Sequence, residues 1–175
     1  MTRRLCPACG TKLIEAVGSD DAPVLIMGEF GGHEEQMSGI PWVGPAGQVL
    51  KAELERAGIN YNDCRVTNLY MHMKPPKGQD PEVADACFKW NMQQLLNEMK
   101  GRKAILLIGS ELAKHFLDGG VMENEGLRVR SPRFPKSVKL AVAVRNPAMC
   151  TMKGRVLGGI RGAIENFSLW SKKYV

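Results

Sequence analysis

The stretch PVLIMG, residues 23–28, decides the fold, because it is a short apolar run that ends in a glycine. Such a run is typical of a strand buried on both faces. Three similar runs follow along the chain: CRVTNL (64–69), AILLIG (104–109) and VKLAVAV (138–144). Segments with helical periodicity separate them, as in proteins whose helices pack on a parallel sheet. We therefore predict an α/β fold, a three-layer sandwich in which helices flank a central, mostly parallel four-stranded sheet.

The segments between these runs carry the signals of helix ends. Gly58 ends the first predicted helix, because glycine readily adopts the left-handed conformation found after helices. Asp80, followed by Pro81, begins the second helix, and the Ser110 side chain is expected to cap the third. The four predicted helices span residues 46–57, 80–100, 110–117 and about 155–170.

The composition favours one globular domain over residues 1–175. The chain has 44% hydrophobic residues and a net charge of +6, which permits a phosphate-rich partner without requiring one. No apolar run approaches the roughly 18 residues of a membrane span, and the start MTRRLC (1–6) lacks the apolar stretch of a signal peptide. We expect a cytoplasmic monomer. Five cysteines, an odd number, argue against a disulfide framework and leave metal binding, buried thiols or chemistry.

Three loops are expected to hold the functional site. They span residues 29–45, 70–79 and 145–154, and each follows a predicted strand. Ligands of open parallel sheets bind beyond the carboxyl ends of the strands, where such loops emerge. We therefore expect the three loops to converge on one cleft.

Several side chains in these loops suit the binding of a flat, polar ligand. Glu29 supplies a carboxylate that can orient or deprotonate a water. Trp42 can offer a flat face to a base, although it can equally plug the core. Asn68 carries both a donor and an acceptor for the edge of a base. Lys74, in a stiff Lys-Pro-Pro run, suits a phosphate or a solvated surface.

The combination of motifs resembles the uracil-DNA glycosylase superfamily, most closely its iron–sulfur type, known as family 4. The matching segments are GEFGG (28–32), GIPWVGPAG (39–47), Thr67-Asn68, Lys74-Pro-Pro and NPA (146–148). Their counterparts in the family include Gly-Glu-Gly/Ala-Pro-Gly, Gly-x-Pro-Phe-Val-Gly-x-Ala-Gly and His-Pro-Ser. The segments occur in the right order over nearly the whole chain, and the second is the most specific.

The resemblance implies an enzyme that binds DNA, flips out uracil or a related modified base and hydrolyses its N-glycosidic bond. It places Glu29 where the family handles the attacking water, Trp42 where an aromatic ring stacks on the base, and Asn68 where the base edge is read. Lys74, together with Lys153 and Arg155 after the last motif, is expected to hold DNA phosphates. No nucleotide cofactor is implied.

Two departures from the family affect the expected pocket. Phe30 and Gly31 replace a small residue and a proline, so the wall of the base pocket is altered. Asn146, expected to be catalytic, replaces the histidine that stabilises the departing base, and a neutral amide should do this less well. A reduced rate or a changed substrate follows. The alternatives are a catalytically silent member that only binds DNA or a base, and a metal-containing regulatory protein that binds another protein.

A third departure concerns the metal. Cys6 and Cys9 form a C-x-x-C knuckle, which in the resembling family joins two later cysteines around a 4Fe–4S cluster. Cys87 stands where one later ligand belongs, but Met73 occupies the other position, with His72 beside it. Three cysteines can hold an incomplete cluster, and His72 can complete either a cluster or a Cys3His zinc site. An empty turn with buried thiols is the remaining alternative.

Overall fold

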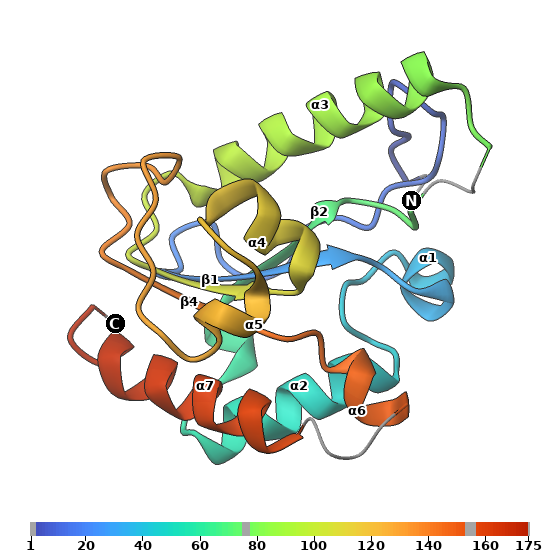
Figure 1. The fold of residues 1–175 in the computed structure, drawn as a ribbon. Helices are drawn as coiled ribbons and strands as arrows, with labels where there is room; N and C mark the ends of the chain where they lie inside the picture. The colour runs from blue at the N-terminus through green and yellow to red at the C-terminus, as the bar shows by residue number, and fades with distance from the viewer. Residues whose placement is uncertain (1–2, 75–77, 153–156, 175) are drawn as a thin grey trace.

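The fold is a four-stranded parallel sheet between helices, as seen in the computed structural model (Figure 1). The structure describes residues 3–74, 78–152 and 157–174, without the side chains of 151 and 152. The strand order is β2-β1-β3-β4, and every pairing of neighbouring strands is parallel. The strands are β1 (Val24–Phe30), β2 (Arg65–Tyr70), β3 (Ala104–Ile108) and β4 (Leu140–Val144). The predicted α/β sandwich is therefore confirmed.

The order of the strands places a crevice at the carboxyl ends of β1 and β3. The chain runs from β1 to β2 on one side and then crosses to β3 on the other side of β1. Met27 of β1 consequently pairs with Thr67 of β2 and with Leu107 of β3. Loops that leave adjacent strands in opposite directions open a crevice at this point, where α/β proteins bind ligands.

Two hydrophobic clusters hold the layers together, one on each face of the sheet. Helices α2 (Pro45–Arg56) and α7 (Leu157–Ser171) cover one face, where Leu50 and Phe167 pack against residues such as Ile26. Helices α3 (Pro81–Met99) and α4 (Ser110–Phe116) cover the other, where Leu95 and Phe116 pack against residues such as Met27. Figure 1 shows these two helical layers above and below the strands. Among the described residues, no helix combines the length and apolar character needed to span a bilayer.

The structure corrects several predicted element boundaries. Strand β1 extends to Phe30, so Glu29 belongs to the strand rather than to the loop. Gly109, with a φ of 107°, is the N-cap of α4, so Ser110 is the first helical residue and its side chain is not the cap. Four short elements lie outside the predicted helices and strands. Each has three to six residues, which are too few for a recognisable hydrophobic period in the sequence. They are α1 (His33–Ser38), η1 (Tyr61–Asp63), α5 (Val121–Asn124) and α6 (Ala148–Met152).

Candidate functional site

A cavity of about 320 Å³ lies at the carboxyl edge of the sheet. Its walls come from the segment after β1, the start of α2, the end of β2 and the segment after β4. The first and last loops therefore converge as predicted, whereas the described residues of the loop at 70–79 do not line the cavity. The lining residues are Phe30, Gly31, Gly32, His33, Glu34, Glu35, Trp42, Gly44, Pro45, Ala46, Asn68, Asn146 and Ala148.

Trp42 both lines the cavity and belongs to the hydrophobic core. Its indole ring packs beside Gly28, where an added Cβ would lie 2.4 Å from Cζ2. Its backbone lies against Gly47 and has a φ of 59°, in the left-handed region that a tryptophan rarely adopts. The two interpretations of Trp42 are thus not exclusive, because one side of the ring fills the core while the residue also borders the cavity.

Asn68 faces the same space with an unsatisfied polar atom. The residue is 4% exposed, and its Oδ1 has no hydrogen-bond partner among the described residues. Trp42 Nε1 is buried and unpartnered in the same way. Buried polar atoms are normally paired, so such atoms in a cavity wall indicate a place for a polar ligand.

Glu29 is held by three donors behind the cavity. Its Oε1 accepts the backbone N–H of Glu111 at 2.8 Å and the Ser110 hydroxyl at 3.4 Å, and its Oε2 accepts Nδ2 of Asn146 at 3.1 Å. Gly109 is needed for this arrangement, because a Cβ there would lie 2.2 Å from the Glu29 carboxyl carbon. Glu29 does not itself line the cavity but is in direct contact with Asn146, which does.

The amide of Asn146 has a fixed orientation. Its Oδ1 accepts the backbone N–H of Ala148 at 3.0 Å, so the amino group is the part that faces Glu29. An amino group has two hydrogens, and Glu29 uses only one of them. Asn146 can therefore still donate a hydrogen bond to a ligand in the cavity that it lines.

Glu35 is a site residue that the sequence reasoning missed. It is 7% exposed and lines the cavity, and its two carboxylate oxygens accept the backbone N–H of Gly32 at 2.9 Å and of Gly44 at 2.7 Å. It thereby ties the start of α1 to the start of α2. The glutamate at the third helical position after Gly32 is one half of a capping box, which was the available signal.

Phe30, Gly31 and Lys74 have different environments. Phe30 is 40% exposed, and Lys74 Nζ lies 5.9 Å from the centre of its ring. At Gly31 an added Cβ would lie 2.3 Å from Cδ1 of Ile14, so packing against the N-terminal segment explains why this position has no side chain. Lys74 also lies 3.8 Å from the Glu111 carboxylate at an exposed position. The predicted phosphate ligands Lys153 and Arg155 lie outside the described residues.

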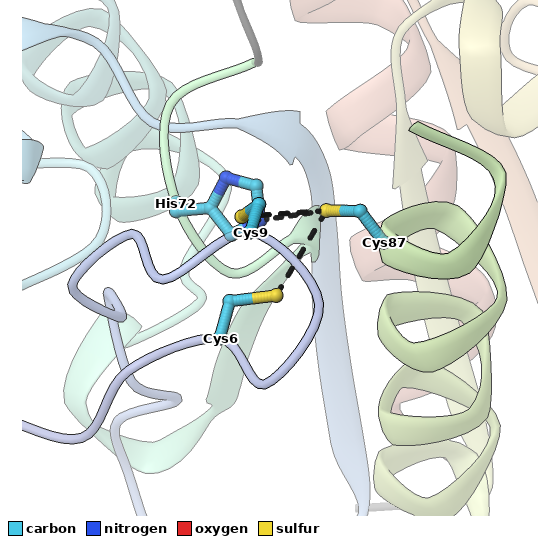
Figure 2. A group of neighbouring side chains, drawn as sticks. All are labelled: Cys6, Cys9, His72 and Cys87. Carbon is cyan, nitrogen blue, oxygen red and sulfur yellow. Dashed lines mark hydrogen bonds between the residues drawn. The ribbon is translucent and has the colours of Figure 1, made fainter. Parts of the chain in front are cut away.

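A second group of candidate residues forms a Cys/His cluster beside α3 (Figure 2). Cys6 and Cys9 come from the N-terminal turn, His72 follows β2, and Cys87 lies in α3. Their donor atoms all lie within 4.8 Å of one another. Met73, by contrast, is 39% exposed. The structure thus brings together the four predicted ligands.

The donors of this cluster are in states suited to a cation. Burial lowers the pKa of His72, and its Nδ1 lies 2.6 Å from the Met73 carbonyl oxygen. A neutral ring that donates from Nδ1 leaves the Nε2 lone pair directed at the thiols. Burial and the neighbouring thiols of Cys6 and Cys9 raise the pKa of Cys87, so a thiolate at Cys87 requires a compensating positive charge. Hydrogen bonds, chiefly from Thr11, outweigh burial at Cys9 and lower its pKa.

The other two cysteines have structural surroundings. Burial raises the pKa of Cys64 to about 12, and the residue packs in the core. Cys150 packs against the same core cluster, and burial raises its pKa as well. Neither is part of the Cys/His cluster. Both therefore act as packing thiols, the buried-thiol alternative that the cysteine count allows.

The parallel sheet and the cavity at its carboxyl edge define an α/β protein with a ligand site at the ends of its strands. The family model described as "Uracil DNA glycosylase superfamily" matches residues 15–157, and the chain belongs to that superfamily.

Curated relatives support this assignment. The chain is 32% identical over 99 residues to the type-4 uracil-DNA glycosylase of Archaeoglobus fulgidus, covering 54% of this chain and 49% of the relative. It is 37% identical over 86 residues to that of Pyrobaculum aerophilum, with 48% and 43% covered. It is 30% identical over 121 residues to that of Thermotoga maritima, with 65% and 62% covered. The matched regions span about half the length of these relatives.

Proposed function

We propose that the protein is a DNA glycosylase that hydrolyses the N-glycosidic bond of uracil, or of a related modified base, flipped out of DNA. The observation that carries this proposal is the cavity in which Trp42, Asn68 and Asn146 meet, with Glu29 bonded to Asn146 behind it. The names of the type-4 relatives agree with it. The silent alternative is not favoured, because the expected base-binding and catalytic side chains lie together.

Recognition of the base is assigned to Asn68 and Trp42. The free Oδ1 of Asn68 can accept the N3–H of a uracil ring, and an amide also has a donor for a ring carbonyl. Trp42 supplies an aromatic wall on which an unstacked base can lie. Both side chains keep their places because Gly28 between them has no Cβ.

Bond cleavage is assigned to Asn146 and Glu29. When the bond between C1′ and the base nitrogen breaks, the electron pair leaves with the base, and the Asn146 amino group stabilises the resulting anion by a hydrogen bond. A water adds to C1′ and gives its proton to the Glu29 carboxylate. The three donors around Glu29 fix the position of its carboxylate, and the hydrogen bond to Asn146 holds the two side chains next to each other.

DNA and metal binding complete the proposal. Lys74 lies on the cavity side of the molecule beside Phe30, where it can contact a backbone phosphate, and Lys153 and Arg155 are proposed for the same task from the sequence. The residues that would hold a metal are Cys6, Cys9, His72 and Cys87. Because they lie outside the cavity, the metal is proposed to stabilise the fold. The monomeric state and the cytoplasmic location stay predictions.

The decisive experiment measures cleavage of oligonucleotides that contain one uracil, either single-stranded or opposite guanine or adenine, followed by alkali. We expect strand breaks with the wild type. Glu29→Gln should lower the single-turnover rate about 10²–10⁴-fold, because the amide cannot accept the proton of the water. Asn68→Ala should weaken selection of the base.

The control is Glu165→Gln, an exposed glutamate on α7, which should cleave like the wild type. Wild-type protein that binds these oligonucleotides without cleaving them would contradict the proposal and favour a silent binding protein. Equal rates for Glu29→Gln and the wild type would remove Glu29 from the mechanism.

A further inference from the structure

We infer that the Cys/His cluster is built for a single tetrahedral ion, zinc(II), and not for the 4Fe–4S cluster of the resembling family. The inference rests on the distances between the four donor atoms, on the identity of the fourth ligand and on its hydrogen bonds. It concerns a site separate from the cavity, so its test is independent of whether the protein excises a base.

The donor distances match the edges of a small tetrahedron. Sγ of Cys87 lies 3.9 Å from Sγ of Cys6 and 3.7 Å from Sγ of Cys9. Nε2 of His72 lies 3.7 Å from Sγ of Cys9 and 3.2 Å from Sγ of Cys87. Zinc–sulfur and zinc–nitrogen bonds of about 2.3 and 2.1 Å give tetrahedral edges of about 3.8 Å between sulfurs and about 3.6 Å between sulfur and nitrogen.

The same distances are too short for an iron–sulfur cubane. In that cluster each ligand binds a different iron at a corner of the cube, so the ligand atoms lie roughly 6 Å apart, with eight core atoms between them. Here no two of the donor atoms lie further apart than 4.8 Å. Figure 2 shows that the side chains of Cys6, Cys9 and His72 converge on the Cys87 sulfur, as ligands of one central ion do.

The fourth ligand fits zinc as well. Met73 stands where the family has its fourth cysteine, but its backbone N–H donates to the Gln36 side chain and its side chain is exposed. His72, fully buried, takes the place instead. Three cysteines and one histidine are a common ligand set of structural zinc sites, and the C-x-x-C spacing of Cys6 and Cys9 is typical of them.

The surroundings orient these ligands. The Met73 carbonyl oxygen lies 2.6 Å from Nδ1 of His72, and a ring that donates from Nδ1 has a lone pair on Nε2 for a metal. Asn91 Nδ2 lies 3.3 Å from the same Nε2. Asn91 donates from Nδ2 to the carbonyl oxygen of Cys87 at 2.8 Å and to its sulfur at 3.4 Å, a contact that stabilises a thiolate. Cys6, His72 and Cys87 are at most 1% exposed and Cys9 is partly buried, so protein atoms enclose most of the site. A closed site of this kind is structural rather than catalytic.

The test is the metal content of the full-length protein, isolated under anaerobic conditions from cells supplied with both iron and zinc. Anaerobic isolation matters because oxygen can destroy an iron–sulfur cluster and let zinc replace it. We expect one zinc per chain, little iron, no acid-labile sulfide and no brown colour. Four irons with four sulfides per chain would overturn the inference, and so would a protein free of metal.

A second measurement uses metal-free protein and cobalt(II) as a spectroscopic probe. One equivalent of cobalt should give the intense visible bands of a tetrahedral site with thiolate ligands, and one equivalent of zinc should abolish them. His72→Ala should bind cobalt with altered bands and at least tenfold more weakly, whereas the control variants His115→Gln and Cys150→Ser should behave like the wild type. Identical cobalt spectra of His72→Ala and the wild type would exclude His72 as a ligand.

Discussion

The cavity and the Cys/His cluster both use the end of β2, but they are built in different ways. Asn68 is the antepenultimate residue of β2, and its position follows from the register of the sheet, in which it pairs with Gly28. His72 lies two residues beyond the strand, and its position depends on partners from an N-terminal turn and from α3. The first region is therefore placed by the backbone of the core, and the second by contacts among its own side chains.

A second difference is how the two regions satisfy their polar groups. The cavity leaves Asn68 Oδ1 and Trp42 Nε1 without partners among the described residues, as expected of a place that receives a ligand from outside. The cluster directs its donors at one another, as expected of a place that holds a resident ion. A site for a transient ligand thus keeps unpaired polar atoms in the free protein, whereas a site for a permanent ion brings its donor atoms together.

The N-terminal segment joins the two regions. Ile14 donates its backbone N–H to the Met71 carbonyl, next to His72, and its side chain packs on Gly31 at the cavity wall. Gln36 of α1 donates to the Lys12 carbonyl and accepts from the backbone N–H of Met73. Loss of the metal should therefore reach the cavity through Ile14 and Gln36.

Removal of the metal should disturb the Cys/His cluster directly, and it is expected to have the largest effect on stability. A site occupied at 1,000 times its dissociation constant stabilises the folded chain by about 4 kcal/mol, so stripping it with a chelator should lower Tm by about 10 °C. Differential scanning calorimetry with and without chelator checks this. Cys150→Ser should show the same loss on chelation as the wild type, and no change of Tm in the wild type would show that the cluster contributes nothing to stability.

Gly28→Ala should disturb the cavity and leave the Cys/His cluster intact. The added methyl group would lie 2.4 Å from both the Trp42 ring and Asn68 Oδ1, so both must move, at a cost of about 1–3 kcal/mol. We expect a lower midpoint of urea unfolding and a fall in uracil cleavage larger than the loss of folded protein explains, with normal metal content. Gly162→Ala, where the added Cβ meets nothing within 4 Å, is the matched control and should gain slight stability as a helix position.

Glu35→Gln tests, with the smallest expected effect, whether the Glu35 carboxylate holds the cavity wall together. The variant keeps one acceptor for the two backbone N–H groups of Gly32 and Gly44 and leaves the other unpaired, at a cost of about 1–3 kcal/mol. Chemical denaturation measures this cost, and a cleavage assay should show weaker substrate binding from a loosened cavity. Glu123→Gln removes the same kind of contact at an exposed helix start and should change stability by much less. Equal effects would show that Glu35 is an ordinary helix cap.

The fold was predictable because its strands are buried on both faces. Runs such as AILLIG are apolar throughout, and a short uninterrupted apolar run predicts a buried strand. Strands β3 and β4 accordingly begin within two residues of their predicted starts. Asn68 and Asn146 were predictable because they stand at strand ends within recognisable motifs. Helix α1 was not, because a carboxylate contact from Glu35, rather than an apolar face, fixes its start.

The remaining features depend on distances that a sequence does not contain. The contact of Glu29 with Asn146 joins residues 117 positions apart. The presence of His72 in the cluster follows from how the chain turns after β2. Ser110 looks like a helix cap in sequence, but Gly109 takes that place because only a glycine leaves room for the Glu29 carboxylate.

The span of the Cys/His cluster along the chain has a consequence for the order of folding. Its ligands are separated by 63 residues between Cys9 and His72 and by 81 residues between Cys6 and Cys87. Closing loops of this length in an unfolded chain costs much conformational entropy, so the ligands meet readily only after β1, β2 and α3 have assembled. The ion should therefore bind late in folding. It should slow unfolding and have little effect on the folding rate.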